Sequence, residues 1–236
     1  MKRWKRRASA AATTAAALWI GWTALTGTDT TTSIVAPPAL PAQQSATVAQ
    51  LLRQVAVIDE LPQVVGYERS CKKGKACVFG PAWNDPLDRS GCDTRQRVLR
   101  AQLTDVTFKP GTRNCKVVSG VLHDPYTGTE IRYSSADPDS VEIDHIAALS
   151  RVWHLGAWRW TAQQRQVFAN DTDNLLAVSG AQNSTKSDAG LREWLPPNQL
   201  YVCPYIEKYL AVMVKYQLPI TRSDRDVAAR SCAAAA

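Results

Sequence analysis

The chain has no Cys-x-x-Cys pair, and its three histidines are scattered over 236 residues. Zinc sites are usually built from closely spaced cysteine and histidine ligands, so this pattern disfavours one. The apolar stretch near the N-terminus, residues 15–25, is shorter than the roughly 20 residues that a membrane-spanning helix needs. No internal repeat and no second domain boundary is visible. The length therefore indicates one globular domain together with a targeting segment.

The first 42 residues have the organisation of an export signal. Basic residues between Lys2 and Arg7 precede the apolar stretch, and a Thr- and Pro-rich segment ends at Ala39-Leu40-Pro41-Ala42, a small-x-small pattern that suits signal peptidase. An uncleaved membrane anchor is the alternative, disfavoured because no long uncharged stretch follows. We expect residues 1–42 to be removed, and the product to be extracellular and monomeric, without stable membrane association.

Net charge says little about the partner. The whole chain has 28 Lys and Arg against 21 Asp and Glu, a formal charge of +7. Residues 1–42 hold five of the basic residues and one of the acidic ones, so the mature chain has 23 against 20, or +3. Such a charge permits a polyanionic substrate without indicating one.

All six cysteines lie beyond the expected signal: Cys71, Cys77, Cys92, Cys115, Cys203 and Cys232. An even number of cysteines in an exported chain indicates three disulfides, because the destination is oxidising. Several pairings are open, and proximity along the chain favours Cys71–Cys77, Cys92–Cys115 and Cys203–Cys232. Paired sulfurs cannot act as nucleophiles, so a thiol enzyme is disfavoured.

The remaining pattern predicts short strands and helices in an α+β fold. Strands are expected within 98–108 and at 115–122, 131–133, 141–146 and 174–178. Helices are expected at 43–60, which belongs to an N-terminal helix and linker ending at residue 63, and at 149–155, 161–169, 204–217 and 223–232. Thr161 and Gln164 have the spacing of a capping box. A further helix is expected from Ser184 toward Trp194, ended by Pro196-Pro197.

The stretch that carries chemistry begins at Glu142-Ile143-Asp144-His145, continues through residues 170–176 and ends at residues 183–188. As strand, loop, strand and helix, it places His145 at the end of the first strand and Asn183 near the start of the helix. The two side chains then face each other across a small cleft. Asn174, in the loop, can bond backbone and fix the orientation of His145.

This arrangement suits hydrolysis of a phosphodiester. His145 can take a proton from water, because an imidazole with a pKa near 6.5 is neutral yet basic at neutral pH. Asp144 and Asn183 offer hard oxygen ligands, which match Mg²⁺ or Mn²⁺, and such an ion polarises the phosphate. Lys186, one helical turn after Asn183, can reach a substrate phosphate. Glu142 alternates onto the Asp144 side of the strand, as a partner behind the ligands or a water-mediated ligand.

On these residues the sequence resembles the HNH endonucleases of the His-Me finger superfamily, in particular their small secreted bacterial members. The family pattern of Asp-His, Asn and then His or Asn falls on Asp144, His145, Asn174 and Asn183. The wider similarity runs from about residue 64 to the C-terminus and includes Gly91-Cys92-Asp93-Thr94-Arg95, Asp124-Pro125-Tyr126-Thr127-Gly128, Phe168-Ala169-Asn170-Asp171, Trp194-Leu195-Pro196-Pro197 and Cys203.

The resemblance implies a ββα-metal finger embedded in a small disulfide-stabilised domain, residues 64–236, with added helices and strands. It also implies hydrolysis of DNA, or RNA, to a 5′-phosphate and a 3′-hydroxyl. Asn183 replaces the histidine of the eponymous motif, which favours magnesium or manganese over zinc because every protein ligand is then oxygen. The alternatives are an inactive exported binding protein of the same fold and a cell-wall hydrolase.

Other polar and aromatic residues are expected to be structural. His123 lies in a turn and His154 in an aromatic-rich helix, without neighbours that would make them catalytic. Asp124 and Tyr126 are interpreted as turn and packing residues. Scattered basic residues such as Arg151 are expected at the solvated surface.

Overall fold

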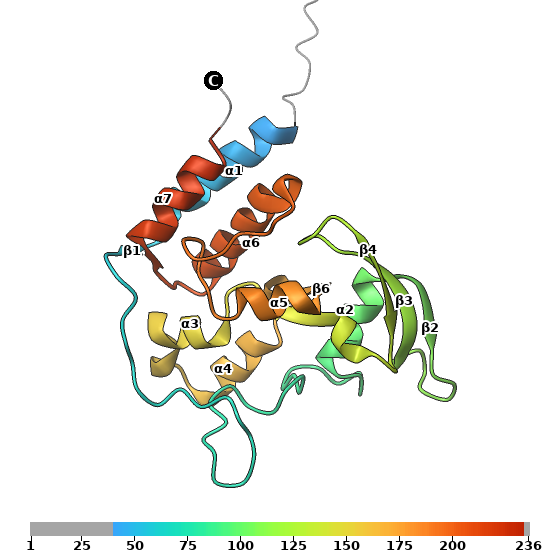
Figure 1. Cartoon of the computed structure of the whole chain (residues 1–236). Helices are drawn as coiled ribbons and strands as arrows, with labels where there is room; N and C mark the ends of the chain where they lie inside the picture. Colours follow the sequence, from blue (N-terminus) through green and yellow to red (C-terminus); the bar gives the residue numbers. More distant parts are fainter. Residues whose placement is uncertain (1–39, 234–236) are drawn as a thin grey trace, which may run out of the picture. The chain divides into compact units, whose positions relative to one another are not determined.

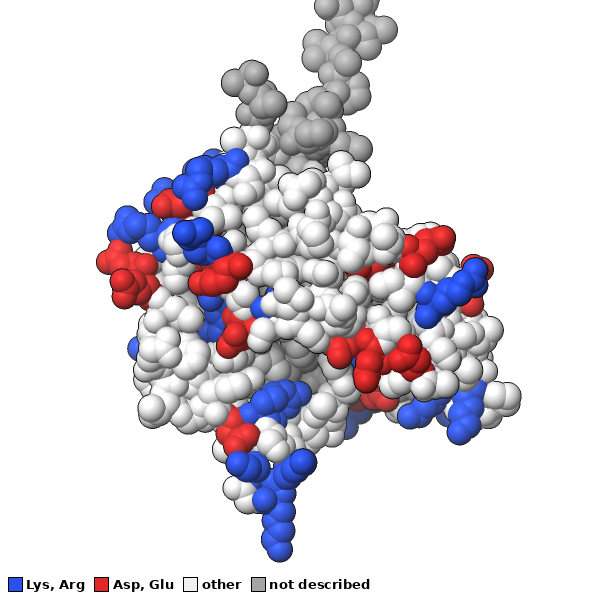
Figure 2. Space-filling model, viewed as in Figure 1, with Lys and Arg blue, Asp and Glu red and all other residues white. Residues whose placement is uncertain are grey.

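The computed structural model describes residues 40–233, which form a mixed α+β fold with seven α-helices and three small sheets (Figure 1). The expected export signal lies outside the described residues, except for residues 40–42, with which α1 begins. None of the helices described is long and apolar enough to cross a membrane. On the face shown in Figure 2 both acidic and basic side chains lie mainly toward the edges, around a broad uncharged centre.

Three helices from the two ends of the described chain pack together. The N-terminal helix α1 (Leu40–Gln54) lies against α6 (Val202–Lys215) and α7 (Arg222–Ser231). Just after α1, β1 (Val57–Ile58) pairs in parallel with β7 (Ile220–Thr221). Apolar positions of these helices point into the larger of two hydrophobic cores. The helix predicted at 43–60 is present as far as Gln54, and its apolar face packs on this core. Its predicted end is wrong, because the chain leaves the helix after Gln54 and Val57–Ile58 form β1.

A second region is built on an antiparallel sheet, seen on the right of Figure 1. Helix α2 (Thr94–Gln102) begins where the Asp93 carboxylate accepts a hydrogen bond from the amide of Gln96. It leads into β2 (Thr104–Phe108), β3 (Val117–His123) and β4 (Glu130–Ser134), in the order β2-β3-β4. The apolar faces of this helix and sheet form the second core.

Between these two regions lie two antiparallel strands and a short helix. β5 (Val141–His145) pairs with β6 (Leu175–Ser179), with His145 opposite Leu175, and α5 (Gly180–Lys186) follows β6 directly. Val141 and Ile143 point into the second core. Because side chains alternate along a strand, Glu142 and Asp144 lie on the opposite face from these apolar residues.

The segment between β5 and β6 folds as predicted. It contains α3 (Leu149–Leu155) and α4 (Ala162–Ala169), the second of which begins with the expected capping box. The helix expected from Ser184 to Trp194 is wrong in both bounds. Helix α5 begins earlier, because Ser179 caps it by accepting from the Gln182 amide. It ends at Lys186, because the next residue, Ser187, has a φ of +51° that cannot continue a helix.

The disulfides are those that proximity along the chain predicted: Cys71–Cys77, Cys92–Cys115 and Cys203–Cys232. The first closes a short loop, and the second ties the start of α2 to the sheet. The third joins α6 to the end of α7. The antiparallel-sheet region and the region of α6 and α7 thus each have their own covalent cross-link, which restricts the unfolded chain.

A buried ion pair connects α3 to α7. The guanidinium of Arg151 donates to the carboxylate of Asp224 at 2.6 Å, and the two side chains are 4% and 0% exposed. A carboxylate oxygen of Glu193 forms a second ion pair with the same guanidinium, at 3.2 Å. The expectation that Arg151 lies at the solvated surface is therefore wrong, because the helix that carries it is packed on its Arg151 side.

This pair yields a stability prediction. Asp224→Ala leaves a buried guanidinium without its main partner, so we expect the free energy of unfolding to fall by about 3 kcal/mol. Urea denaturation measures this change. The matched control is Asp59→Ala, which removes an exposed partner of Arg222 and should leave the denaturation midpoint nearly unchanged. Equal effects of the two substitutions would contradict the structural role of the Arg151–Asp224 pair.

Candidate active site

Three of the predicted site residues line one cleft of about 490 Å³. Asp144 and His145 enter it from the end of β5, and Asn183 enters it from α5. The other lining residues come from the segment before α2, from β5, from α3 and from the turn after α5: Tyr67, Arg69, Trp83, Ile143, Ala148, Leu149, Ser150, Ser187 and Asp188. The three side chains predicted to face one cleft thus line the same one.

The imidazole of His145 is held by the last residue of α4. Its Nε2 lies 2.9 Å from the carbonyl oxygen of Ala169. A carbonyl can only accept, so Nε2 carries the proton in the neutral ring and Nδ1 carries the lone pair. The indole of Trp83 stacks on the ring, with centroids 5.8 Å apart and planes 9° from parallel. The helical segment between the strands therefore sets both the orientation and the tautomer of His145.

Burial lowers the pKa of His145 from its usual 6.5 to about 4. The loss of hydration is the largest cause, because it disfavours the charged imidazolium, and the positive charges of Arg69 and Lys186 act in the same direction. The hydrogen bond to Ala169 and the charge of Asp144 oppose the shift. At neutral pH the ring is therefore neutral and able to accept a proton.

Asp144 is a buried carboxylate that accepts hydrogen bonds from two side chains. Its Oδ2 accepts from the hydroxyl of Tyr126 at 2.5 Å, and its Oδ1 accepts from Nζ of Lys186 at 2.8 Å. The same ammonium donates to the backbone carbonyl of His145 at 2.9 Å. A lysine and a tyrosine from distant parts of the chain thus fix the carboxylate.

The expectation that Lys186 reaches a substrate phosphate is wrong. Its side chain is 0% exposed, and its ammonium points inward to the end of β5. Lys186 is the last residue of α5, and the turn at Ser187 carries the chain away directly after it. The helical spacing from Asn183 was predicted correctly, but the amphipathic direction of so short a helix cannot be read from seven residues.

Asn183 and Glu142 form a pair. The side-chain amide of Asn183 donates from Nδ2 to Oε2 of Glu142 at 2.6 Å. This hydrogen bond assigns the amide orientation, so the remaining group, Oδ1, is the acceptor that Asn183 can offer. Within residues 40–233, no three His, Cys, Asp or Glu side chains gather as a metal-binding group. The side-chain oxygens that line the cleft include those of Asp144, Asn183 and Asp188, and Glu142 lies behind Asn183.

Asn174 holds the backbone that follows His145. It is fully buried, and its Oδ1 accepts from the Ala147 amide at 2.8 Å while its Nδ2 donates to the Ala147 carbonyl at 3.2 Å. Its own carbonyl accepts from the amide of Ile146 at 2.9 Å. Asn174 bonds backbone across the loop, as predicted. These hydrogen bonds are to the backbone of Ile146 and Ala147, so it acts on the imidazole indirectly, by positioning the chain that follows His145.

Sequence reasoning missed several residues of the cleft. Trp83, Arg69 and Tyr67 lie more than 60 positions before His145, in an irregular segment whose course no periodicity predicts. Tyr126 was interpreted as a packing residue, although it binds Asp144. Asp124 is structural, as expected, since its carboxylate accepts amides of its own turn and of Ser179. The sequence did point to Tyr126 in one way. Its Asp-Pro-Tyr-Thr-Gly segment is among those that resemble the secreted HNH proteins, but the resemblance assigned the tyrosine no role.

The other two histidines are structural or exposed. His154 accepts the amide of Val64 at Nδ1, 3.0 Å away, and so anchors the segment after α1. His123 is largely exposed, with a carboxylate oxygen of Glu130 3.6 Å from its Nδ1. Neither lines the cleft of His145. The expectation that both lack a catalytic role agrees with these positions.

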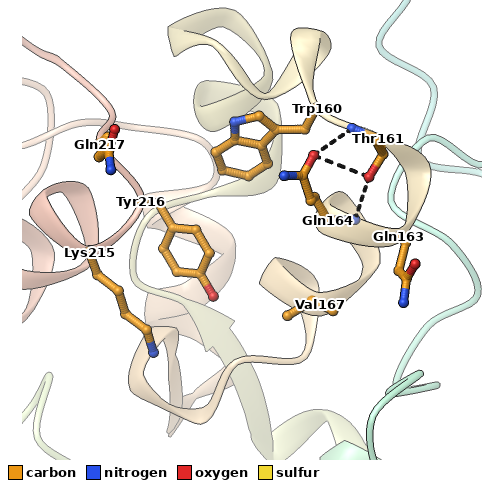
Figure 3. A pocket seen from close by; sticks show the side chains of 8 residues that line it. All are labelled: Trp160, Thr161, Gln163, Gln164, Val167, Lys215, Tyr216 and Gln217. Atoms are coloured by element: carbon orange, nitrogen blue, oxygen red, sulfur yellow. Dashed lines mark hydrogen bonds between the residues drawn. The ribbon is translucent and has the colours of Figure 1, made fainter.

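A second cleft, of about 500 Å³, lies where the start of α4 faces the end of α6 (Figure 3). Trp160 and Tyr216 form its aromatic walls. Gln164 is engaged in the capping box, and Lys215 is held by Asp171 and Asp173 at 2.7 Å each. No histidine or carboxylate of the described residues lines this cleft, so the candidate site for chemistry is the cleft of His145.

Comparison with known proteins identifies the family of the chain. The family model described as "GmrSD restriction endonucleases, C-terminal domain" matches residues 93–228, more than half of the chain and all of the β5-β6-α5 unit. A protein of Arthroderma benhamiae described as an uncharacterized secreted protein is 35% identical over 205 residues, which is 86% of this chain and 90% of that protein. No solved structure matches significantly. The chain belongs to the family of GmrSD restriction endonuclease C-terminal domains and is a protein of nuclease type.

Proposed function

We propose that the protein is a secreted, metal-dependent endonuclease of the HNH type that hydrolyses DNA. The observation that carries the proposal is the placement of His145. Its ring donates from Nε2 to Ala169 and so keeps its lone pair on Nδ1, in the same cleft as Asp144 and Asn183. The order of strand, strand and helix, with Asp-His at the end of the first strand and Asn on the helix, is the one that the HNH finger requires.

The donor set fits a magnesium ion. Asp144 uses one lone pair on each carboxylate oxygen for Tyr126 and Lys186, and about two further acceptor positions remain. Asn183 adds an amide oxygen, and all of these are hard ligands, which suit Mg²⁺ or Mn²⁺ better than zinc. When bound there, the ion would offset charge on the scissile phosphate and on the departing oxygen.

The protein's own residues prepare the attack on phosphorus. Nδ1 of His145 accepts a proton from water, while the carbonyl of Ala169 holds the ring and stabilises the imidazolium that forms. Glu142 holds the amide of Asn183, which keeps its oxygen in a fixed orientation. Arg69, on the cleft wall, is anchored by a 2.8 Å bond to the carbonyl of Gly80 and has further N–H donors for a phosphate oxygen.

Secretion is part of the proposal. Three disulfides stabilise the described residues, and a relative that matches most of the chain is a secreted protein. Disulfides persist outside the cell and are rare in the cytosol. The relative is fungal, so the distribution of such proteins is wider than the bacterial one that resemblance implied.

A plasmid-nicking assay tests the proposed function. The purified protein should cut DNA with Mg²⁺ or Mn²⁺, and EDTA should stop the cutting. His145→Ala should lower the rate by roughly 10²–10⁴-fold, because it removes the general base. The matched control is His123→Ala, which removes a largely exposed histidine outside the cleft and should leave the rate unchanged. Undiminished cutting by His145→Ala would refute the proposed base.

Asn183→His tests the place of residue 183 beside the ion. An imidazole can donate to Glu142 through one nitrogen and offer the other to a metal, which adds a ligand that nickel and zinc favour. We expect isothermal titration to show tighter Ni²⁺ binding by this variant than by the parent protein. Ser184→His puts the same side chain at an exposed neighbouring position and serves as the control. Equal nickel affinities in both variants would exclude Asn183 as a ligand.

The pKa of His145 predicts a pH-dependent stability. In the folded state the pKa is about 4, against about 6.5 in the unfolded chain, so between these values the unfolded chain binds more protons. Stability is therefore lost as pH falls from about 6.5 toward 4, by at most about 1.4 kcal/mol per pH unit. Urea denaturation in EDTA should show this loss in the wild type relative to His145→Gln. Parallel pH profiles would mean that the imidazole is not held neutral.

A further inference from the structure

The loop closed by Cys71–Cys77 projects from the molecule beside the cleft. Residues 71–76 are exposed, and the loop forms the protrusion at the lower edge of Figure 1. In the space-filling view the same protrusion carries a group of basic side chains with little acid around its tip (Figure 2). Its sequence is Cys-Lys-Lys-Gly-Lys-Ala-Cys. This is a concentration of positive charge in a chain whose mature net charge is small.

The loop has a fixed shape. The amide of Lys75 donates to the carbonyl of Lys72 at 3.0 Å, and Gly74 takes the positive φ of +82° that this turn requires. At its base, amides of Cys77 and Val78 donate to carbonyls of the opposite arm, and the disulfide closes the ring. Lysines on such a loop are presented to a partner at a low entropic cost of ordering the backbone.

Of the three lysines in the loop, one has an acidic partner. Lys75 forms an ion pair with Glu68 at 3.1 Å. Lys72 and Lys73 have no carboxylate within ion-pair distance among residues 40–233, and both are exposed at the tip. Two unpaired ammonium groups on a rigid projection form a site for an anion outside the protein.

The stem of the loop is also a wall of the cleft. Tyr67 and Arg69 line the space that His145 faces, and Arg69 is only two residues from Cys71. Lys73 lies four residues after Arg69, which is at most about 14 Å of extended chain. Because nucleotides rise about 3.4 Å along a strand, this length corresponds to about four nucleotides.

We propose that the Cys71–Cys77 loop is a contact surface for the nucleic-acid backbone, with Lys72 and Lys73 binding phosphates a few nucleotides from the one at His145. The inference rests on the proposed function, since it takes the substrate to be a nucleic acid. Ammonium groups on flexible stems recognise phosphate as point charges, so the surface gives affinity without reading bases. The substrate is thereby held across the mouth of the cleft.

The test measures binding, in EDTA, of a duplex oligonucleotide to the full mature protein at a series of salt concentrations. Lys72→Ser combined with Lys73→Ser should reduce the magnitude of the slope of log K against log salt by about 2, because each lost phosphate contact removes about 0.9. Affinity near 0.1 M salt should fall roughly tenfold or more. The control is Arg225→Ser with Arg230→Ser, which makes the same charge change on exposed positions of α7 and should keep the wild-type slope.

The outcomes separate this inference from the proposed function. An unchanged slope in the loop variant, in a protein that nicks plasmid, would overturn the surface and leave the nuclease standing. A loop-dependent slope in a protein that never nicks DNA would support the surface and overturn the catalytic proposal. Loop-dependent binding to phosphatidylglycerol vesicles with no binding to the duplex would overturn the surface, because the partner would then be a lipid.

Discussion

The buried contact between Lys186 and Asp144 determines the geometry of the whole site. Its 2.8 Å bond joins the end of α5 to the end of β5, and the same ammonium holds the carbonyl of His145. One ammonium group therefore fixes the carboxylate of Asp144 and the backbone of His145, the proposed general base, together. The pair is fully enclosed, so removing either member would leave an uncompensated charge in a medium that solvates it poorly. The hydroxyl of Tyr126 completes the set from the opposite side.

The helices between β5 and β6 do more than pack the core: one of them orients His145. Helix α4 ends where its last carbonyl, that of Ala169, meets the imidazole of His145. The position of this carbonyl depends on the capping box at the other end of α4 and on the packing of Phe168 in the larger core. The orientation of the proposed base is thus set by ordinary helix physics at residues that never touch a substrate.

Much of this site could be predicted because its members lie on short, strongly patterned elements. The run from Val141 to His145 is apolar at alternate positions, which identifies a strand and therefore the side on which Asp144 lies. Disulfides between near neighbours were predictable for the same local reason. Whether the predicted roles of Asp144, His145 and Asn183 hold is a chemical question that the proposed experiments address.

The missed features depend on contacts that no local pattern encodes. The inward course of Lys186 follows from a positive φ at Ser187 and from a carboxylate 42 positions earlier in the chain. Tyr126 joins the site because β3 and β4 carry their connecting turn toward β5. Trp83 stacks on His145 from a segment without regular structure. Each is a tertiary contact. Secondary-structure propensity predicts little about a side chain whose position is determined by long-range packing.

The internal counter-charge of Asp144 has a consequence for how the protein is made. Many ion sites concentrate carboxylates whose mutual repulsion weakens the apo fold until a cation arrives. Here the chain provides its own ammonium, so the carboxylate is neutralised before any ion is present. We expect the polypeptide to reach its native conformation without added divalent cations, so that the proposed ion would be needed only for turnover. Folding would then not depend on the concentration of divalent cations outside the protein, whereas activity would.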